Sequence, residues 1–253
     1  MQNIEMHRST ERVLSILEYA SKSDSIGFTL KEISQVLDAP KSSLYPILQT
    51  LSQMGFISYS TSDFRYKIGY KSFEVGSSYL RNGGINNDIS TQLKEISGSC
   101  GESCHFGELI GGDVLYLFKE DSIHSIRMFS SPGRKIPAYA TAIGKALLSE
   151  KTLEELISLY SNTLEVLTPN TITSFEKLCS QLTEIRTSGF AYEVEESTPL
   201  IRCVAVPVYK GNEIIGAFSV AIPVFRYAKE KEEEIKLLLQ KARSTIEQRI
   251  AGI

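Results

Sequence analysis

Cysteine and histidine are scarce in this chain, and their scarcity limits the chemistry it can carry. The 253 residues include four cysteines, Cys100, Cys104, Cys179 and Cys203. They are too few and too scattered to form a disulfide framework. Cys100 and Cys104 have no second pair, and no nearby histidines, at the spacing of metal ligands, so the sequence predicts no metal site.

A catalytic centre is equally hard to assemble from these residues. Cys203 is a candidate nucleophile, but the chain has only His7, His105 and His124 to activate it, and none is near in sequence. There is no glycine-rich phosphate loop, so no nucleotide cofactor is predicted. We therefore expect a protein that is not an enzyme and has no cofactor, in which His105 and His124 are structural or exposed.

Long apolar runs and a strong charge of one sign are also missing. The sequence has no apolar stretch of the roughly 18 residues that a membrane span needs. Its N-terminus is polar, unlike a signal peptide. A net charge of −3 excludes a strongly basic nucleic-acid coat. These features predict a cytoplasmic protein with no membrane contact.

Three short amphipathic helices are predicted near the N-terminus, over residues 9–23, 29–37 and 41–54. Apolar residues recur there at helical spacing. Thr29 and Glu32 form the capping-box pattern that opens the second helix. The residues expected to be buried are Val13, Leu14, Ile16, Leu17, Ala20, Leu30, Ile33, Val36, Leu37, Leu44, Ile47, Leu48, Leu51 and Met54.

Two strands are expected to follow, over residues 56–59 and 64–68, joined by a polar turn. On the second strand, apolar residues alternate on one face and two cations lie on the other. The apolar set is Phe64, Tyr66 and Ile68. Three helices followed by two strands is the order of a winged helix-turn-helix, a DNA-binding domain, which we assign to residues 8–69.

DNA contact is predicted for the polar residues that packing leaves free. Residues near the start of a recognition helix reach base edges and phosphates in the major groove. Cations on the wing suit phosphate contact, which adds affinity but reads no sequence. The predicted DNA-binding residues are Lys41, Ser42, Ser43, Tyr45, Arg65 and Lys67.

The charge of this region predicts that one copy binds DNA weakly. Residues 1–80 hold eight Lys and Arg against eight Asp and Glu. We therefore expect a homodimer or tetramer that places copies on a palindromic, double-stranded operator. Winged helices also serve in protein interactions, so a protein-interaction scaffold with a vestigial pocket stays open as the alternative. Salt separates the two, because DNA affinity falls steeply as salt rises.

Beyond the winged helix, residues 70–84 are expected to form a linker helix, suited to dimer contact and to motion between domains. From Ser103 the apolar period changes to two. The expected strands are 105–110, 114–118, 123–129, 190–195, 203–209 and 213–222. The expected helices of this part are 85–99, 141–149, 152–160, 173–188 and 229–250. An antiparallel sheet surrounded by helices is an α+β, sensor-like domain, which we assign to residues 85–253.

From about residue 8 to 250 the chain resembles the IclR family of bacterial regulators. In the first domain the matching segments are 29–33 (TLKEI), 41–45 (KSSLY), 51–56 (LSQMGF) and 66–69 (YKIG). In the second they are 133–137 (GRKIP), 140–148 (ATAIGKALL), 195–196 (EE), 202–208 (RCVAVPV) and 216–220 (GAFSV), a more specific set. The resemblance implies a GAF-like effector domain, a dimer or tetramer, and control of catabolic genes, with repression the commoner mode.

Two positions depart from the family pattern. Pro46 stands in the third helix where members commonly carry arginine, so a DNA contact by this residue is lost. We place Pro46 in or just after the first turn, where a missing N–H has little effect. Leu200 stands where a glycine usually precedes the Arg202–Cys203 strand. We expect this leucine to narrow the pocket mouth and to shift the choice of effector.

A ligand site is predicted where a helix begins at Thr141, after a loop rich in proline and glycine. The first N–H groups of a helix are unpaired and lie at its positive end, so they attract carboxylates. By resemblance, the effector-binding residues are Ala142, Ile143, Glu193, Ile201, Cys203 and Ser219. We predict a small organic acid or related metabolite, held by the 142–143 N–H groups and Ser219, with Glu193 accepting a hydroxyl. Purely structural roles for Glu193, Cys203 and Ser219 stay open.

Overall fold

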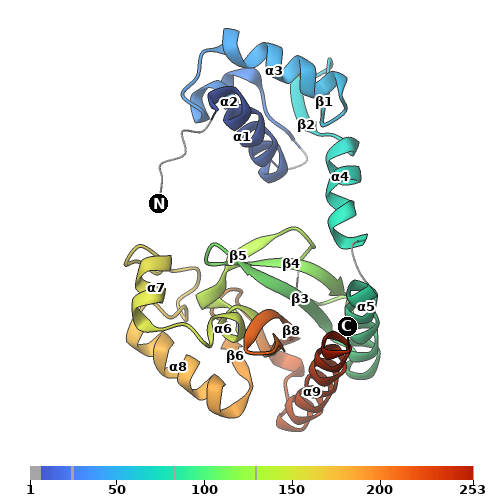
Figure 1. The fold of residues 1–253 in the computed structure, drawn as a ribbon, viewed down its shortest axis with the longest axis vertical. Coiled ribbons are helices and arrows are strands. Elements are labelled where there is room, and N and C mark those ends of the chain that lie inside the picture. The colour runs from blue at the N-terminus through green and yellow to red at the C-terminus, as the bar shows by residue number, and fades with distance from the viewer. Residues whose placement is uncertain (1–6, 24–25, 82–83, 129, 253) are drawn as a thin grey trace. The chain divides into compact units, whose positions relative to one another are not determined.

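The chain folds as two compact units, which we describe separately. A computed structural model describes residues 7–23, 26–81, 84–128 and 130–252. Contacts divide the chain into Met1–Asn82 and Gly83–Ile253 (Figure 1).

The first unit contains three helices and a two-stranded hairpin, in the predicted order. Its elements are α1 (Arg8–Lys22), α2 (Leu30–Val36), α3 (Lys41–Gln53), β1 (Ile57–Ser60), β2 (Arg65–Ile68) and α4 (Tyr70–Arg81). The predicted capping box opens α2: Thr29 N donates to Glu32 Oε2 at 2.7 Å, and Glu32 N donates to Thr29 Oγ1 at 3.2 Å. These elements confirm the winged helix-turn-helix.

Fewer apolar residues are buried in the first unit than helical spacing predicts. Its fully buried residues include Ile16, Phe28, Ile33, Leu44, Leu48 and Ile57. The residues predicted to be inside but found exposed are Leu14, Val36, Met54, Phe64 and Ile68. The first three lie at the edges of their apolar stripes, and three short helices enclose a single central layer. Phe64 falls in the turn before β2, with a left-handed φ of 56°, so the predicted alternation does not include it.

A six-stranded antiparallel sheet forms the centre of the second unit, in the order β5-β4-β3-β8-β7-β6. The strands are β3 (Ser103–Ile110), β4 (Asp113–Glu120), β5 (Lys135–Pro137), β6 (Ala191–Val194), β7 (Ile201–Lys210) and β8 (Glu213–Pro223). The α-helices are α5 (Gly84–Cys100), α6 (Ala142–Leu148), α7 (Leu153–Leu159), α8 (Phe175–Ser188) and α9 (Lys229–Ala251). Short 3-10 helices span Ala138–Ala140 and Val224–Arg226.

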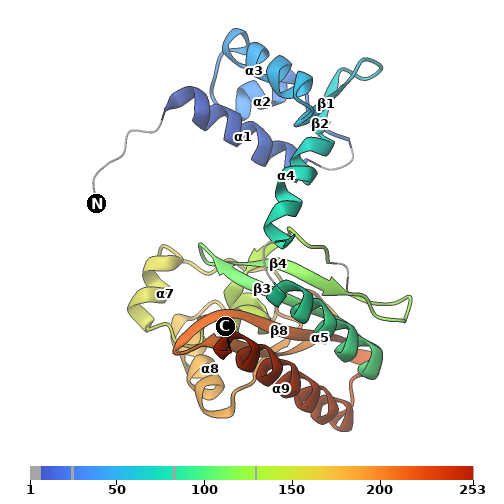
Figure 2. The ribbon, with the colours of Figure 1, turned by 45° about the vertical axis from the view of Figure 1, so that its right-hand side comes forward.

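Each face of this sheet has its own apolar core. Helices α5 and α9 pack side by side on one face, against Phe106, Val204 and Phe218 (Figures 1 and 2). Helix α6 packs on the other face, against Ala205 and Ala217, with α7 and α8 behind it. Side chains alternate between these faces along each strand. The predicted α+β fold with an antiparallel sheet is confirmed.

The predicted strand over residues 123–129 is wrong. Residues 123–128 form no strand, and Ile123 and Ile126 are exposed. A strand forms only where a neighbouring backbone supplies hydrogen bonds. Beside β4, residues 133–137 occupy that edge, through β5 and the bond from Gly133 N to Tyr116 O. Residue 129 lies outside the described residues.

Candidate functional site

The first turn of α3 presents polar side chains to solvent. Lys41, Ser42 and Tyr45 are exposed. Ser43 is half-buried, and its hydroxyl donates to Pro40 O at 2.7 Å. The structure therefore leaves three of the four predicted α3 residues open to a DNA partner, while the Ser43 proton is already engaged.

Pro46 lies just after the first turn of α3, where the sequence placed it. The helix begins at Lys41 and continues through Pro46 to Gln53. Pro46 is therefore in the second turn, where its ring removes an N–H that would otherwise bond within the helix. Its carbonyl oxygen accepts a hydrogen bond from Thr50 Oγ1 at 2.9 Å.

The wing differs from its prediction at Arg65. Two free cations were expected here, but Arg65 Nη1 donates to Gly27 O at 2.8 Å and lies 3.5 Å from Glu32 Oε2. Arg65 therefore ties the wing to the start of α2, because its guanidinium reaches backbone and carboxylate together. Lys67 is half-buried beside it, with no ion-pair partner among the residues described.

In the second unit, the start of α6 has unpaired N–H groups. Thr141 caps the helix: its Oγ1 accepts from Gly144 N at 3.0 Å, and its carbonyl accepts from Lys145 N at 2.9 Å. Within the described residues, no acceptor contacts the N–H groups of Ala142 and Ile143. Both side chains are buried. These two N–H groups therefore have no partner among the described residues, and their role in holding a carboxylate stays a prediction.

The sheet places a row of polar side chains on the face that α6 covers. Glu193 pairs with Cys203, and Ser219 lies between Ala205 and His105 in the strand register. Alternation places Glu193, Cys203, Ser219 and His105 on the same face as Ala205. Ile201 packs beside them in a small apolar cluster with Met128 and Ala221. The register thus brings the predicted sheet residues together, and it adds His105.

Glu193 is held at one oxygen and unpartnered at the other. Its Oε1 accepts from Glu196 N at 2.7 Å and Ser197 N at 3.0 Å. Its Oε2 is buried without a hydrogen bond to any described residue. Burial raises the pKa of Glu193, and burial together with the nearby Glu193 charge raises the pKa of Cys203. A buried acceptor without a partner carries an unpaid desolvation cost, so a hydrogen bond from a ligand to this oxygen would be strongly favourable.

A buried ion pair lies behind Glu193. Lys145 is fully buried, and its Nζ lies 2.6 Å from Glu196 Oε1 and donates to Tyr192 O at 3.1 Å. Burial lowers the pKa of Lys145 and raises that of Glu196, against the attraction between them. The pair fixes α6 to the turn that carries the Glu193 contacts.

Leu200 affects the backbone of the β6–β7 turn, whereas the sequence suggested an effect on the pocket mouth. Its φ is +63°, a left-handed conformation that favours glycine, and its side chain is 61% exposed. Its N–H donates to Glu195 Oε2 at 2.9 Å, which holds the β6–β7 turn. The departure from glycine therefore bears on backbone strain at the turn, since the leucine side chain points to solvent.

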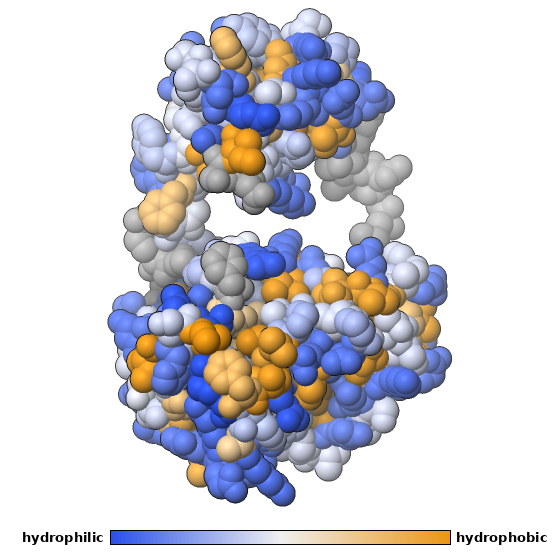
Figure 3. Space-filling view, turned by 180° about the vertical axis from the view of Figure 1, so that it is seen from behind, coloured by the Kyte–Doolittle hydropathy of each residue, from blue (hydrophilic) through white to orange (hydrophobic). Residues whose placement is uncertain are grey.

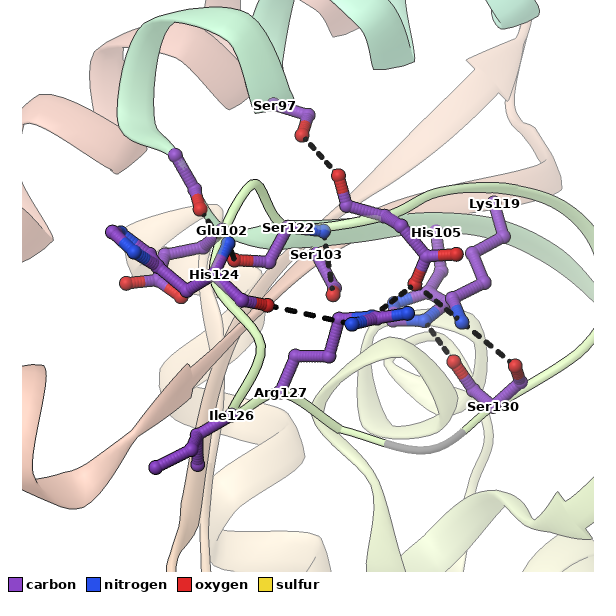
Figure 4. A network of polar contacts seen from close by, with 12 residues as sticks. Ser97, Glu102, Ser103, His105, Lys119, Ser122, His124, Ile126, Arg127 and Ser130 are labelled. Carbon is purple, nitrogen blue, oxygen red and sulfur yellow. Dashed lines mark hydrogen bonds and ion pairs between the residues drawn. The ribbon is translucent and has the colours of Figure 1, made fainter.

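A polar network joins the sheet to the segment after β4 (Figure 4). His105 Nε2 lies 2.7 Å from Ser130 Oγ, and Lys119 Nζ donates to Ser130 O at 2.8 Å. Lys119 and Arg127 both pair with Asp121. This network holds residues 121–128 and Ser130 against the polar face of the sheet, where Met128 is buried.

Metal binding, thiolate reactivity and membrane spanning have no structural basis in the described residues. They contain no cluster of His, Cys, Asp and Glu that could hold a metal ion. The four cysteines are free thiols, and burial keeps the pKa of Cys203 well above its ordinary value, so it lacks thiolate character. None of the described helices is long and apolar enough to cross a membrane.

Family comparisons assign nearly the whole chain. Residues 9–60 match the IclR helix-turn-helix domain, and residues 77–248 match the family described as bacterial transcriptional regulator IclR C-terminal. The chain belongs to the IclR family of bacterial transcriptional regulators. It is 32% identical to the HTH-type transcriptional regulator KdgR of Escherichia coli K12, over 92% of this chain and 89% of that protein. Its relatives are named as regulators, which confirms that it is a DNA-binding regulator and not an enzyme.

Solved structures share the fold of this IclR-family regulator. An IclR regulator from Alicyclobacillus acidocaldarius matches with a TM-score of 0.87, at 23% identity, over 97% of this chain and all of that one. An IclR homologue from Microbacterium hydrocarbonoxydans, complexed with 4-hydroxybenzoate, matches with a TM-score of 0.81 at 19% identity, over 97% of this chain and all of that one. At these identities the likeness shows the fold.

The sequence missed several residues around the IclR-family site. His105 is fully buried and contacts Ser130, which fits the structural role expected for it, but its place beside Ser219 was not predicted. Lys145 and Glu196 were given no role, because a lysine in an apolar helix does not reveal its partner. A signal for Lys145 does exist: every other residue of α6 is apolar or glycine, so its charge has to be paired inside.

His105 should make the regulator less stable at low pH. Burial, with a smaller contribution from the Lys119 charge, lowers the pKa of His105 from 6.5 to about 3. The unfolded chain binds a proton below pH 6.5, whereas the folded chain does not. Stability is therefore full above 6.5 and falls by about 1 kcal/mol per pH unit as pH drops toward 3. His105→Gln should flatten this slope in urea unfolding followed by circular dichroism.

Two carboxylates oppose this effect. The pKa values of Glu193 and Glu196 are raised, so their contribution is present below their ordinary pKa and is lost as pH rises through the raised value. The difference between wild type and His105→Gln isolates the histidine. Equal slopes in the two proteins would contradict this account of His105.

Proposed function

We propose that this protein is a repressor of catabolic genes whose hold on its operator is set by a small organic acid. The first unit places α3 in the major groove and its wing on phosphate. The second unit binds the effector. A protein that covers promoter DNA excludes the polymerase, and a regulator of the bacterial chromosome acts in the cytoplasm.

The buried polar face of the second unit carries this proposal. The N–H groups of Ala142 and Ile143 supply two donors for a carboxylate, and Ser219 lies on the facing sheet. The unpaired Glu193 Oε2 offers an acceptor for a hydroxyl of the same ligand. Donors and an acceptor on one enclosed face suit a hydroxylated or related organic acid. Ile201 and Cys203 supply its apolar walls. The Microbacterium homologue, which is complexed with 4-hydroxybenzoate, supports a small hydroxylated acid as the class of effector.

Two copies of the chain are proposed to meet through α4. Tyr70 and Phe73 share one face of this helix and are 74% and 79% exposed. Val75 lies on the opposite face and is also exposed. Apolar side chains reach the surface of both units (Figure 3). A helix that is apolar on both faces needs a partner, and a second copy pairs the two DNA-binding units for a palindromic operator. We propose that residues 70–84 link the units and pass the effector signal between them.

Phe73→Glu should shift the protein from dimer to monomer. A charge placed in an apolar interface loses the burial of the phenyl ring and adds a desolvation penalty, together about 2 kcal/mol or more. Sedimentation and light scattering report the mass, and binding to a two-fold DNA site should weaken with it. Glu74→Gln, next to it, is the control and should stay dimeric. If the Phe73→Glu protein were still a dimer, α4 would not form the dimer interface.

The function is tested by binding of the full chain to its own upstream promoter DNA at low and high salt, with a panel of small carboxylates. We expect tight binding that weakens with salt and changes with one acid. Coupling requires that this acid bind one arrangement of the DNA-binding units better than another.

The double variant Lys41→Ala, Lys67→Ala should lower the affinity for DNA uniformly across sequences and reduce its dependence on salt. Arg65 is left intact because it holds the wing. Absence of any preference for the promoter over random DNA would favour the protein-interaction scaffold.

A further inference from the structure

The exposed side of α3 has two edges of opposite character. One edge faces α1 and forms an apolar groove lined by Val13, Leu17, Pro46, Ile47, Thr50 and Met54. The other edge faces the wing and forms a polar cleft lined by Tyr45, Gln49, Ser52, Gln53, Tyr59 and Tyr66. Hydrogen-bonding groups that can read bases are therefore concentrated on the wing side of the helix.

One hydrogen bond orients the central side chain of this polar edge. Gln49 Nε2 donates to Tyr45 Oη at 3.1 Å, across one turn of α3. An amide has two N–H donors and one oxygen acceptor. With one N–H given to Tyr45, the amide retains a second N–H and its Oε1 acceptor. Both residues are exposed, so this outer edge of Gln49 is open to a partner.

We propose that Gln49, positioned by Tyr45, reads an A·T base pair in the major groove. Adenine alone shows an acceptor, N7, next to a donor, N6, on its major-groove edge, and this pair complements the remaining amide edge of glutamine. Guanine shows two acceptors there and satisfies only the N–H. This inference rests on the proposed function, in which α3 lies in the groove.

The position of Gln49 fits this role. It lies eight residues after Lys41, or about 12 Å along the helix axis, which is close to the width of the major groove. Contacts at Lys41 and Gln49 therefore reach different base pairs or opposite walls of the groove. Pro46 and Thr50, on the other edge, present no matching pair of donor and acceptor outward, because the Thr50 hydroxyl bonds to Pro46 O.

The test is selection of binding sites by the full chain from duplexes with a randomised core. Wild type should select one fixed A·T pair in each half-site that Gln49→Ala no longer selects, while the rest of the motif is kept. On the selected duplex, Gln49→Ala should lose about tenfold in affinity with an unchanged salt slope. Replacing that adenine by 7-deazaadenine, which lacks N7, should weaken wild type and leave Gln49→Ala unaffected.

Two further variants separate reading from general damage. Tyr45→Phe keeps the ring but removes the oxygen that orients the amide, so discrimination at the same base pair should fall part-way. Thr50→Ala, exposed on the other edge, should select the wild-type motif. A uniform loss in Gln49→Ala on all sequences, with a smaller salt slope, would mean a phosphate contact and overturn the proposal, as would an unchanged motif. Failure of wild type to select any motif would instead overturn the proposed function.

Discussion

Replacing Lys145 with methionine should lower the free energy of unfolding by about 3–5 kcal/mol. Lys145 and Glu196 are both buried, and Nζ lies 2.6 Å from Oε1. Removal of the ammonium group leaves the Glu196 carboxylate inside without its counter-charge, and it leaves Tyr192 O without a donor. Urea unfolding followed by circular dichroism measures the loss, since the chain has no tryptophan.

The size of this effect depends on Glu196. Lys145→Met combined with Glu196→Gln should recover much of the stability, because the uncompensated charge is gone. Lowering the pH should narrow the gap between wild type and the single variant, since burial raises the pKa of Glu196 and favours its protonated form. Lys151→Met, which breaks the exposed pair with Glu155, is the matched control and should change stability by no more than about 1 kcal/mol. A single variant as stable as wild type would show that the Lys145–Glu196 pair contributes nothing.

Ala142→Pro should weaken binding of the effector acid by roughly 10–100-fold. The change deletes one unpaired N–H donor at the start of α6, and a hydrogen bond to a charged group contributes about 1.5–3 kcal/mol. Proline is tolerated at the first position of a helix. Thr141, with φ −127° and ψ 148°, already has the extended conformation that a residue before proline needs. Titration calorimetry with the acid that alters DNA binding measures the loss.

Ala142→Gly is the matched control for this prediction. It keeps the N–H and removes only the methyl group, so it should bind the acid nearly as wild type does. Circular dichroism should show that both variants are folded. If a folded Ala142→Pro protein bound the acid with unchanged affinity, the ligand carboxylate would not bind at the start of α6. Ser219 and Glu193 would then be the residues left to hold the ligand.

Local sequence patterns predicted the elements of this protein well, because their causes are local. The Thr29–Glu32 capping box and the spacing of Leu44, Leu48 and Leu51 define α2 and α3 within a few residues. Two apolar runs on either side of a Lys210–Gly211–Asn212 turn likewise define the long hairpin of β7 and β8. The strand expected over 123–129 is wrong for the complementary reason: it contains apolar residues, but residues 133–137 already occupy the edge of β4 where it would have to bond.

The sequence by itself determined most of the helices and strands and the winged helix, since periodicity and capping act over a few residues. Only the tertiary structure decided which polar groups are free and which are paired. Arg65 bonds to Gly27 across 38 residues, and Lys145 meets Glu196 across 51. The position of His105 beside Ser219 depends on strand register alone. Such pairings are set by packing and burial over the whole domain, so neither partner carries a local signal of the other.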